Sequence, residues 1–306
     1  MSQTAILLIS LAILAHLVAD FVFQTNAIAE AKAAPDRRGW RGLATHTGIV
    51  AICLVPFVLA YGGRGLAYLV VVSLAHGLID RTKVVLNWRA VRSAGSGPAQ
   101  AEAPSGTDEV AEAERPAVAA EMAGGAEVPG DQVWTPLPAV LFLADQAAHL
   151  VVLVLGASVI LLGYPLTDAW RSAVHDLGGH LLPVSHPQAA LIVIVVLVDL
   201  VIFNIRGGLF LVGTLLTPHG FSEGAEPGPE RVGATIGVLE RLIVCALVLT
   251  GQIVAIGLVI AAKTLARFRQ LDDRRFAEYY LVGTLASVTL ALATSIVAAA
   301  ALASLR

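Results

Sequence analysis

The sequence predicts an all-α protein, a polytopic bundle of about seven transmembrane helices. Three observations carry this prediction: apolar residues make up 57% of the 306 residues, charged residues make up only 14%, and the mean hydropathy is +0.77. Soluble globular domains contain about 25% charged residues, so this composition favours helices that face lipid. The formal net charge of −3 argues against a nucleic-acid-binding protein, which needs a basic surface.

Apolar runs of about 20 residues, the length at which a helix crosses a bilayer, define the predicted spans. They are 5–23, 43–61, 66–86, 137–162, 189–205, 242–262 and 281–305. The first run lacks a basic start and a small-residue cleavage site, so we expect it to be retained as a span rather than removed as a signal peptide. Two shorter apolar pieces, 209–217 and 231–241, are predicted to be half-helices, a re-entrant pair or surface segments.

Residues 93–132 differ in composition from the rest of the chain. They are rich in Ala, Glu, Gly and Pro, and they contain eight acidic residues against one basic residue. Such a stretch cannot bury enough apolar surface to offset its chain entropy, so we predict a disordered acidic linker. It would separate a three-span part, 1–92, from a part of about four spans, 133–306.

Basic residues are distributed unevenly among the predicted loops. Four follow the first span and four lie at the end of the third, whereas the loop after the second span contains only Arg64. Because short cytoplasmic loops retain Lys and Arg, the N-terminus is expected outside and the first loop and the linker in the cytoplasm. The basic segment 264–275 does not fit a seven-span count, which leaves the side of the C-terminus open.

Pairs of His and Asp four residues apart recur inside the predicted spans. Residues at this spacing share one face of a helix. With the orientation above and a rise of about 1.5 Å per residue, the residues of these pairs and His46 are predicted to lie at a similar depth in the cytoplasmic leaflet. A four-helix arrangement could bring seven residues to one site, and their convergence is open at this point because the sequence does not give the rotation of the helices: His16, His46, His76, His149, Asp20, Asp80 and Asp145.

These ionisable residues predict a metal site. Each costs about 2.5–3.5 kcal/mol at the centre of a membrane helix, so the group must be paired, hydrated or bound to an ion. Imidazole and carboxylate ligands together suit zinc, manganese or iron, and all seven residues are predicted ligands. The three Asp would alternatively orient the imidazoles or act as a general base. Lys83 and Gln24 are predicted to hold an anionic substrate.

The function that follows is an intramembrane metal-dependent hydrolase whose substrate is a lipid headgroup, a lipid-linked molecule or a peptide. Two alternatives use the same residues. The first is a proton- or cation-coupled transporter, for which broken helices around Gly207 and Gly208 would be suitable. The second is a structural protein in which the polar groups hold helices together. The substrate, the reaction and the oligomeric state are open at this point.

The second half of the chain contains further polar residues within apolar runs. Asp199 and Arg206 are seven residues apart and are expected to pair on one helix face. Glu240 and Arg241 are expected to form an intrahelical or interhelical ion pair. Lys263 is predicted to lie at a basic helix end and reach the lipid headgroups.

Four motifs resemble a bacterial multi-pass membrane family known as domain of unknown function 3307 (DUF3307). They are His16-Leu-Val-Ala-Asp20-Phe-Val-Phe-Gln24, His46, His76-Gly-Leu-Ile-Asp80-Arg-Thr-Lys83 and Asp145-Gln146-Ala-Ala-His149. The resemblance covers residues 5–90 and 137–155, and stretches around Glu240, Lys263 and Glu278 resemble the C-terminal part of longer members. It implies a multi-pass topology, a location in the bacterial inner membrane and this choice of His and Asp residues, and it implies no particular reaction.

Overall fold

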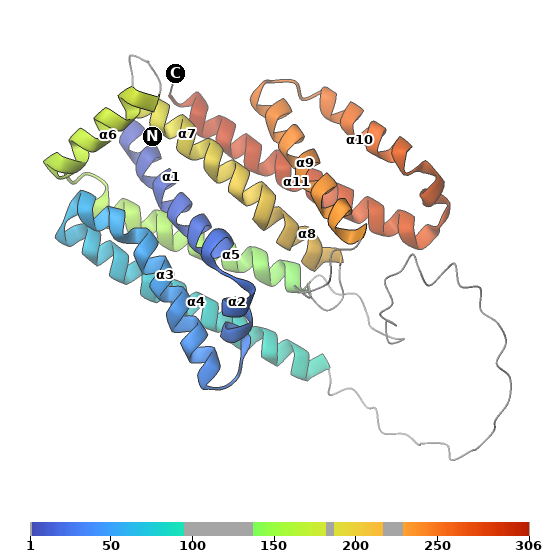
Figure 1. Ribbon diagram of the computed structural model, residues 1–306, viewed down its shortest axis with the longest axis horizontal. Coiled ribbons are helices and arrows are strands. Elements are labelled where there is room, and N and C mark those ends of the chain that lie inside the picture. The colour runs from blue at the N-terminus through green and yellow to red at the C-terminus, as the bar shows by residue number, and fades with distance from the viewer. Residues whose placement is uncertain (1, 95–136, 182–186, 217–228, 306) are drawn as a thin grey trace.

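The computed structural model describes residues 2–94, 137–181, 187–216 and 229–305. Every element in these ranges is a helix, which confirms the all-α prediction (Figure 1). The predicted acidic linker, 93–132, lies outside the described residues except for its first two, which end helix α4. Its disorder therefore stays a prediction.

Five helices are long and apolar enough to cross a membrane. They are Gln3–Phe23, Arg37–Tyr61, Leu137–Leu161, Gln188–Leu216 and Phe276–Ala303. Each corresponds to one predicted span, so the protein is a membrane protein built from helical spans. Their outward faces are apolar, as lipid contact requires; for example, Ile52 and Leu285 are exposed.

The N-terminal part forms a helical layer around α1. Helix α1 (Gln3–Leu17) begins at Ser2, whose hydroxyl accepts a hydrogen bond from the backbone N–H of Ala5, and continues into a π-helical turn, η1 (Val18–Phe23). The short helix α2 (Asn26–Ala33) leads to α3 (Arg37–Tyr61). Helix α4 (Gly63–Ala94) returns along α3. It contains the predicted third span, 66–86, but its polar residues keep it out of the five apolar helices.

Two glycines shape the turn between α3 and α4. Gly62 has a φ of +58°, which L side chains rarely adopt. Gly65, the third residue of α4, packs so closely on α3 that a Cβ atom there would lie 1.9 Å from the carbonyl oxygen of Phe57. The tight turn sets α3 and α4 side by side from their first contact (Figure 1).

The C-terminal part contributes the remaining helices. They are α5 (Leu137–Gly156) with the π turn η2 (Ala157–Leu161), α6 (Asp168–Leu181), α7 (Pro187–Ile202) with the π turn η3 (Phe203–Gly207), α8 (Gly208–Leu216), α9 (Pro229–Leu249), α10 (Ala255–Ala266), the 3-10 turn η4 (Phe268–Asp272) and α11 (Arg274–Ala303). Helix α5 packs on α4, and α7 packs on α1. The two parts of the chain therefore meet along α1, α4, α5 and α7.

The structure corrects the predicted elements of the second half. The predicted span 242–262 is wrong, because the helix ends at Leu249 and Gly251 turns the chain with a φ of +77° before α10 begins. The piece 209–217 is not a separate half-helix, since α8 continues α7 through η3 without leaving helical backbone. The piece 231–241 lies within α9. The broken helices expected around Gly207 and Gly208 are therefore absent from this described segment.

Two apolar clusters hold the bundle together, and α1 takes part in both. The first lies among α1, α3, α4 and η2 and includes Leu8, Leu54 and Tyr68. The second lies among α1, α7, α9 and α11 and includes Ile6 and Ile192. Helix α1 is thus the central element of the bundle. The polar residues of α1 lie at the end of the first cluster, where α1 passes into η1.

Candidate metal centre

The structure brings the seven predicted His and Asp residues into one buried cluster. Four helical segments supply them: α1 with η1, α3, α4 and α5. Every side chain of the cluster is less than a tenth exposed. The members are His16 and Asp20, His46, His76 and Asp80, and Asp145 and His149. We refer to these seven residues as the His/Asp cluster.

The closest contacts in the cluster join His46, His76 and Asp20. The two Nε2 atoms lie 3.0 Å apart, and the Oδ1 atom of Asp20 lies 3.4 Å from each of them. Ligands of a tetrahedral zinc ion lie about 3.3–3.4 Å from one another, because each metal–ligand bond is about 2.0–2.1 Å long. These three atoms are therefore spaced as ligands of a single ion would be.

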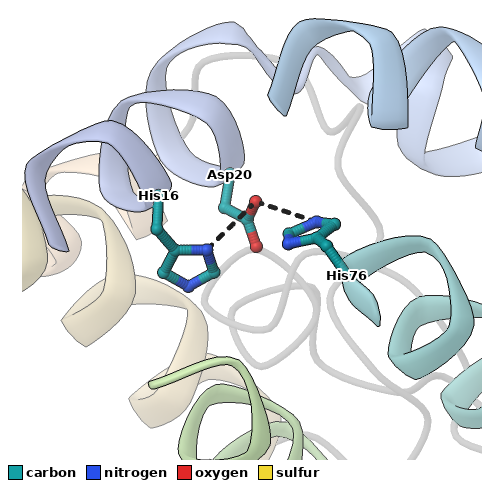
Figure 2. Close-up of side chains that lie close together, drawn as sticks. All are labelled: His16, Asp20 and His76. Atoms are coloured by element: carbon teal, nitrogen blue, oxygen red, sulfur yellow. Dashed lines mark ion pairs between the residues drawn. The ribbon is translucent and has the colours of Figure 1, made fainter. Parts of the chain in front are cut away.

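His16 faces the same oxygen from the other side (Figure 2). Its Nδ1 atom lies 3.7 Å from Oδ1 of Asp20. Its Nε2 atom lies 3.3 Å from the carbonyl oxygen of the Gln146 side chain, and that amide is oriented by the hydrogen bond its NH₂ group donates to Asp145. Because an amide oxygen accepts, Nε2 of His16 is the donor in this contact. Nδ1 of His16 faces the carboxylate of Asp20, and either a proton on Nδ1 or a metal ion between the two atoms would make this contact favourable.

Several buried atoms of the cluster lack hydrogen-bond partners in the described part of the chain. They include Nδ1 of His16, Oδ1 of Asp20 and both ring nitrogens of His149. Buried polar atoms without partners are costly. These nitrogen and oxygen atoms are suited to bind a metal ion, because no hydrogen bond occupies their lone pairs.

Asp80 lies beside the same two imidazoles but is already paired. Its Oδ2 atom is 3.5 Å from Nε2 of His46 and 3.6 Å from Nε2 of His76. The same oxygen accepts a hydrogen bond of 2.8 Å from Nζ of Lys32. Asp20 is therefore the carboxylate more open to an ion, and Asp80 is the one held by an ammonium group.

His149 and Asp145 extend the cluster along α5. The ring of His149 stacks on that of His76, with centroids 4.1 Å apart, and lies 5.0 Å from that of His16. Nδ1 of His149 is 3.8 Å from Asp145. Together with Asp80, these two residues form one of three overlapping groups whose ligand atoms lie within 4.8 Å of each other. The cluster could thus hold one ion, or a second one on the α5 side.

Lys83 and Gln24 have protein partners in the structure. Lys83 donates a hydrogen bond of 2.8 Å to Asp145, and Gln24 accepts one of 2.6 Å from Lys32. Their predicted role in holding an anionic substrate stays a prediction. In the structure they complete the network of charges around the cluster.

Sequence reasoning missed Lys32, which it placed in a cytoplasmic loop. Helix α2 folds back on α3 and carries Lys32 to Asp80, 48 residues along the chain. Gly42 permits this packing, because a Cβ atom there would lie 2.6 Å from the backbone nitrogen of Lys32. No spacing in the sequence links Lys32 to Asp80; the glycine in α3 is the only local signal.

The charges of the cluster do not balance. Asp20, Asp80 and Asp145 supply three negative charges, and Lys32 and Lys83 supply two positive ones. With neutral imidazoles, one negative charge stays uncompensated in a buried site, which is unfavourable. A bound cation, whether a metal ion or a proton, would compensate it.

The comparison with known proteins adds one finding. Residues 7–108 match the model of the family described as "Protein of unknown function (DUF3307)". The resemblance drawn from the motifs is thereby confirmed over this range. No curated protein and no solved structure matches the chain.

The DUF3307 match covers most of the His/Asp cluster. It includes α1 to α4, and so the three residues with the closest contacts as well as Lys32 and Asp80. Asp145 and His149, from α5, lie beyond it. The centre formed by Asp20, His46 and His76 therefore falls entirely inside the matched segment.

A glycine next to His76 allows the two imidazoles to meet. Gly77 packs against Thr47, the neighbour of His46, and a Cβ atom on Gly77 would lie 2.9 Å from the Thr47 hydroxyl oxygen. We expect Gly77→Val to push α3 from α4 and to weaken metal binding by about 10–100-fold, the loss typical when the support of a ligand is disturbed. Competition with a fluorescent zinc chelator measures this affinity.

Gly48→Val is the matched control for this prediction. Gly48 also lies within two residues of a cluster histidine, but a Cβ atom there meets nothing within 4 Å. The control should retain the affinity of the wild type. Equal affinities of both variants would mean that the spacing of α3 and α4 does not set the site.

Proposed function

We propose that this protein is a membrane-embedded metal-dependent hydrolase with its ion held by Asp20, His46 and His76. The spacing of these three ligand atoms, 3.0–3.4 Å, carries the proposal. The donor set of two imidazoles and one carboxylate suits zinc, iron or manganese. It also resembles the three-ligand sets of catalytic metal sites, which leave one position for water.

His16 supports the same site from the side of α1. Its Nδ1 atom faces Asp20, so His16 would be either a fourth ligand or a hydrogen-bond acceptor for a bound water. The two roles differ in consequence. As a ligand it would close the site, and as an acceptor it would leave the position open for catalysis.

Asp80 has the position of a general base. Its Oδ2 atom lies within 3.6 Å of both imidazoles, so a water molecule held at the site would be within its reach. A bound divalent ion lowers the proton affinity of such a water enough to give hydroxide near neutral pH. Asp80 would take the proton, and Lys32 would hold its carboxylate in place.

A lipid-borne ester is the substrate class that the surroundings favour. Leu74 and Leu78 are 68% and 69% exposed on the outer face of α4, the helix that supplies His76. Apolar side chains so exposed face lipid in a membrane helix. The cluster therefore lies on the inner side of a helix whose outer side faces lipid, and we propose that its substrate comes from the bilayer.

The test uses purified full-length protein in vesicles of phosphatidylethanolamine and phosphatidylglycerol. We expect release of water-soluble headgroups or free fatty acids, detected by mass spectrometry, on addition of zinc or manganese and its loss with chelator. Asp80→Asn should retain the ion but lose turnover by about 100-fold or more, the range of a general base. Metal-bound protein without turnover on these lipids would reject this substrate class.

A proton or cation relay is the second candidate, and the row of imidazoles favours it. Neighbouring rings in the cluster have centroids 4.1–5.6 Å apart, and ion-paired carboxylates flank them, as in proton pathways of membrane proteins. A pH-sensitive dye inside the same vesicles separates the two functions. Flux driven by a membrane potential without headgroup release would support transport instead.

A further inference from the structure

A second buried charge lies in the C-terminal part, away from the His/Asp cluster. Arg241 of α9 is only 2% exposed. Its expected ion pair with Glu240 is wrong, because the carboxylate of Glu240 pairs with Lys263 of α10. Lys263 does lie in the last turn of α10, as predicted, and its reach to the lipid headgroups stays a prediction.

The guanidinium of Arg241 contacts only neutral groups. Nε donates a hydrogen bond of 2.7 Å to the backbone carbonyl of Asn204, and Nη1 donates one of 3.2 Å to the hydroxyl of Ser287. Nη2 is buried and has no hydrogen-bond partner in the described residues. No carboxylate forms an ion pair with Arg241 within the described ranges. A buried cation in this state is strongly unfavourable.

The structure keeps room for this side chain. A Cβ atom on Gly208 would lie 2.6 Å from Nε of Arg241 and 2.9 Å from its Cζ. Helix α8 thus passes directly over the guanidinium, and only a glycine fits there. Asn204 of η3 and Ser287 of α11 hold it from two sides, so its position is fixed by three helical segments.

A small cavity adjoins the guanidinium. Its lining includes Arg241, Lys263, Glu240, Thr284 and Ser287, with apolar residues around them. Its volume is about 10 Å³, which is room for one water-sized particle. The two basic residues and one carboxylate leave a net positive charge. Because Ser287 accepts a hydrogen bond from Arg241, its own O–H group is free to donate into the cavity.

We infer that this cavity binds one small monovalent anion of the halide class, with chloride as the probe. The anion neutralises Arg241 and accepts hydrogen bonds from Nη2 and from the Ser287 hydroxyl. The bound anion would join α9 to α11 and to η3, so it stabilises the C-terminal part. This site is independent of the proposed metal centre.

Equilibrium binding of radioactive chloride to the detergent-purified full chain tests the inference, in gluconate buffer at constant ionic strength. We expect one saturable chloride per chain, displaced by bromide and not by gluconate. Arg241→Gln should reduce binding to background. Chloride should raise the midpoint of thermal unfolding of the wild type and leave that of Arg241→Gln unchanged. Arg274→Gln, at an exposed position, is the control and should behave as the wild type.

Two milder variants keep the test decisive if Arg241→Gln does not fold. Ser287→Ala should weaken chloride binding by about tenfold to 100-fold, the value of one hydrogen bond to a charged group. Gly208→Ala should weaken it by displacing the guanidinium, while Gly257→Ala, whose Cβ would meet nothing within 4 Å, should not. Absence of saturable chloride binding in the folded wild type, or unchanged binding in Ser287→Ala and Gly208→Ala, would overturn the inference and leave a cavity that holds water only.

Discussion

Replacing Lys32 with methionine should destabilise the folded protein by about 3–5 kcal/mol, the cost of removing one partner from a buried ion pair. Nζ of Lys32 lies 2.8 Å from Asp80, and the two side chains are 11% and 6% exposed. Methionine retains most of the apolar stem, so the change removes the charge and little packing. The free energy of unfolding, measured by SDS titration in mixed micelles with chelator present, gives the effect.

Two further variants show whether the lost ion pair is the cause. Lys32→Met combined with Asp80→Asn should recover much of the lost stability, because no unpaired charge remains. Arg274→Met breaks the exposed pair with Glu278 and should cost at most about 1 kcal/mol. If Lys32→Met costs no more than Arg274→Met, the pair with Asp80 does not contribute as a buried ion pair does.

Replacing Asp20 with asparagine should weaken zinc binding strongly. Loss of a side chain that only orients a metal ligand weakens binding by about 10–100-fold, and the loss of Asp20, a proposed ligand, should exceed this. Asparagine has nearly the same shape, so the helix packing is retained while the charge is lost. Oδ1 of Asp20 is the atom that lies 3.4 Å from both Nε2 atoms. Competition with a zinc chelator in detergent measures the affinity.

The matched controls are two other aspartates. Asp168→Asn, at a side chain that is 97% exposed, should bind zinc as the wild type does. Asp145→Asn, on the α5 side of the cluster, should have a smaller effect than Asp20→Asn. A larger loss of zinc affinity in Asp145→Asn than in Asp20→Asn would indicate that the ion binds near His149 and not between His46 and His76.

The shared helix face of each His–Asp pair could be predicted from the spacing, whereas the convergence of the pairs could not, because the sequence does not give the rotation of the helices. Residues four apart share a face, and charged groups in a membrane helix must face the protein interior. His16 with Asp20 and His76 with Asp80 follow both rules, and α1 and α4 turn these faces toward each other. Apolar length likewise predicted the five helices that can span the membrane.

The structural features that could not be predicted from the sequence depend on backbone turns and on packing between residues far apart in the chain. Lys32 reaches Asp80 only because α2 folds back over Gly42. The predicted span 242–262 is wrong because mean hydropathy does not register a turn at Gly251. The pairing expected between Asp199 and Arg206 is also wrong: Arg206 donates instead to the carbonyl oxygen of Phe21, and one carboxylate oxygen of Asp199 lacks a partner within the described chain.

The error at Glu240 and Arg241 was avoidable on physical grounds. Consecutive residues on a helix point in different directions and do not face each other. In the structure Glu240 accordingly meets Lys263 of α10, while Arg241 turns to Asn204 and Ser287. Adjacent opposite charges on a helix therefore do not by themselves predict an ion pair.

Elemental analysis by mass spectrometry of the detergent-purified protein tests the central claim most directly. Wild type, His46→Gln, His76→Gln and Asp168→Asn would be expressed with zinc, manganese and iron available. We predict near-stoichiometric metal in the wild type and in Asp168→Asn, and its loss in both histidine variants. A well-folded wild type without metal, or metal retained in both histidine variants, would contradict a metal centre at Asp20, His46 and His76.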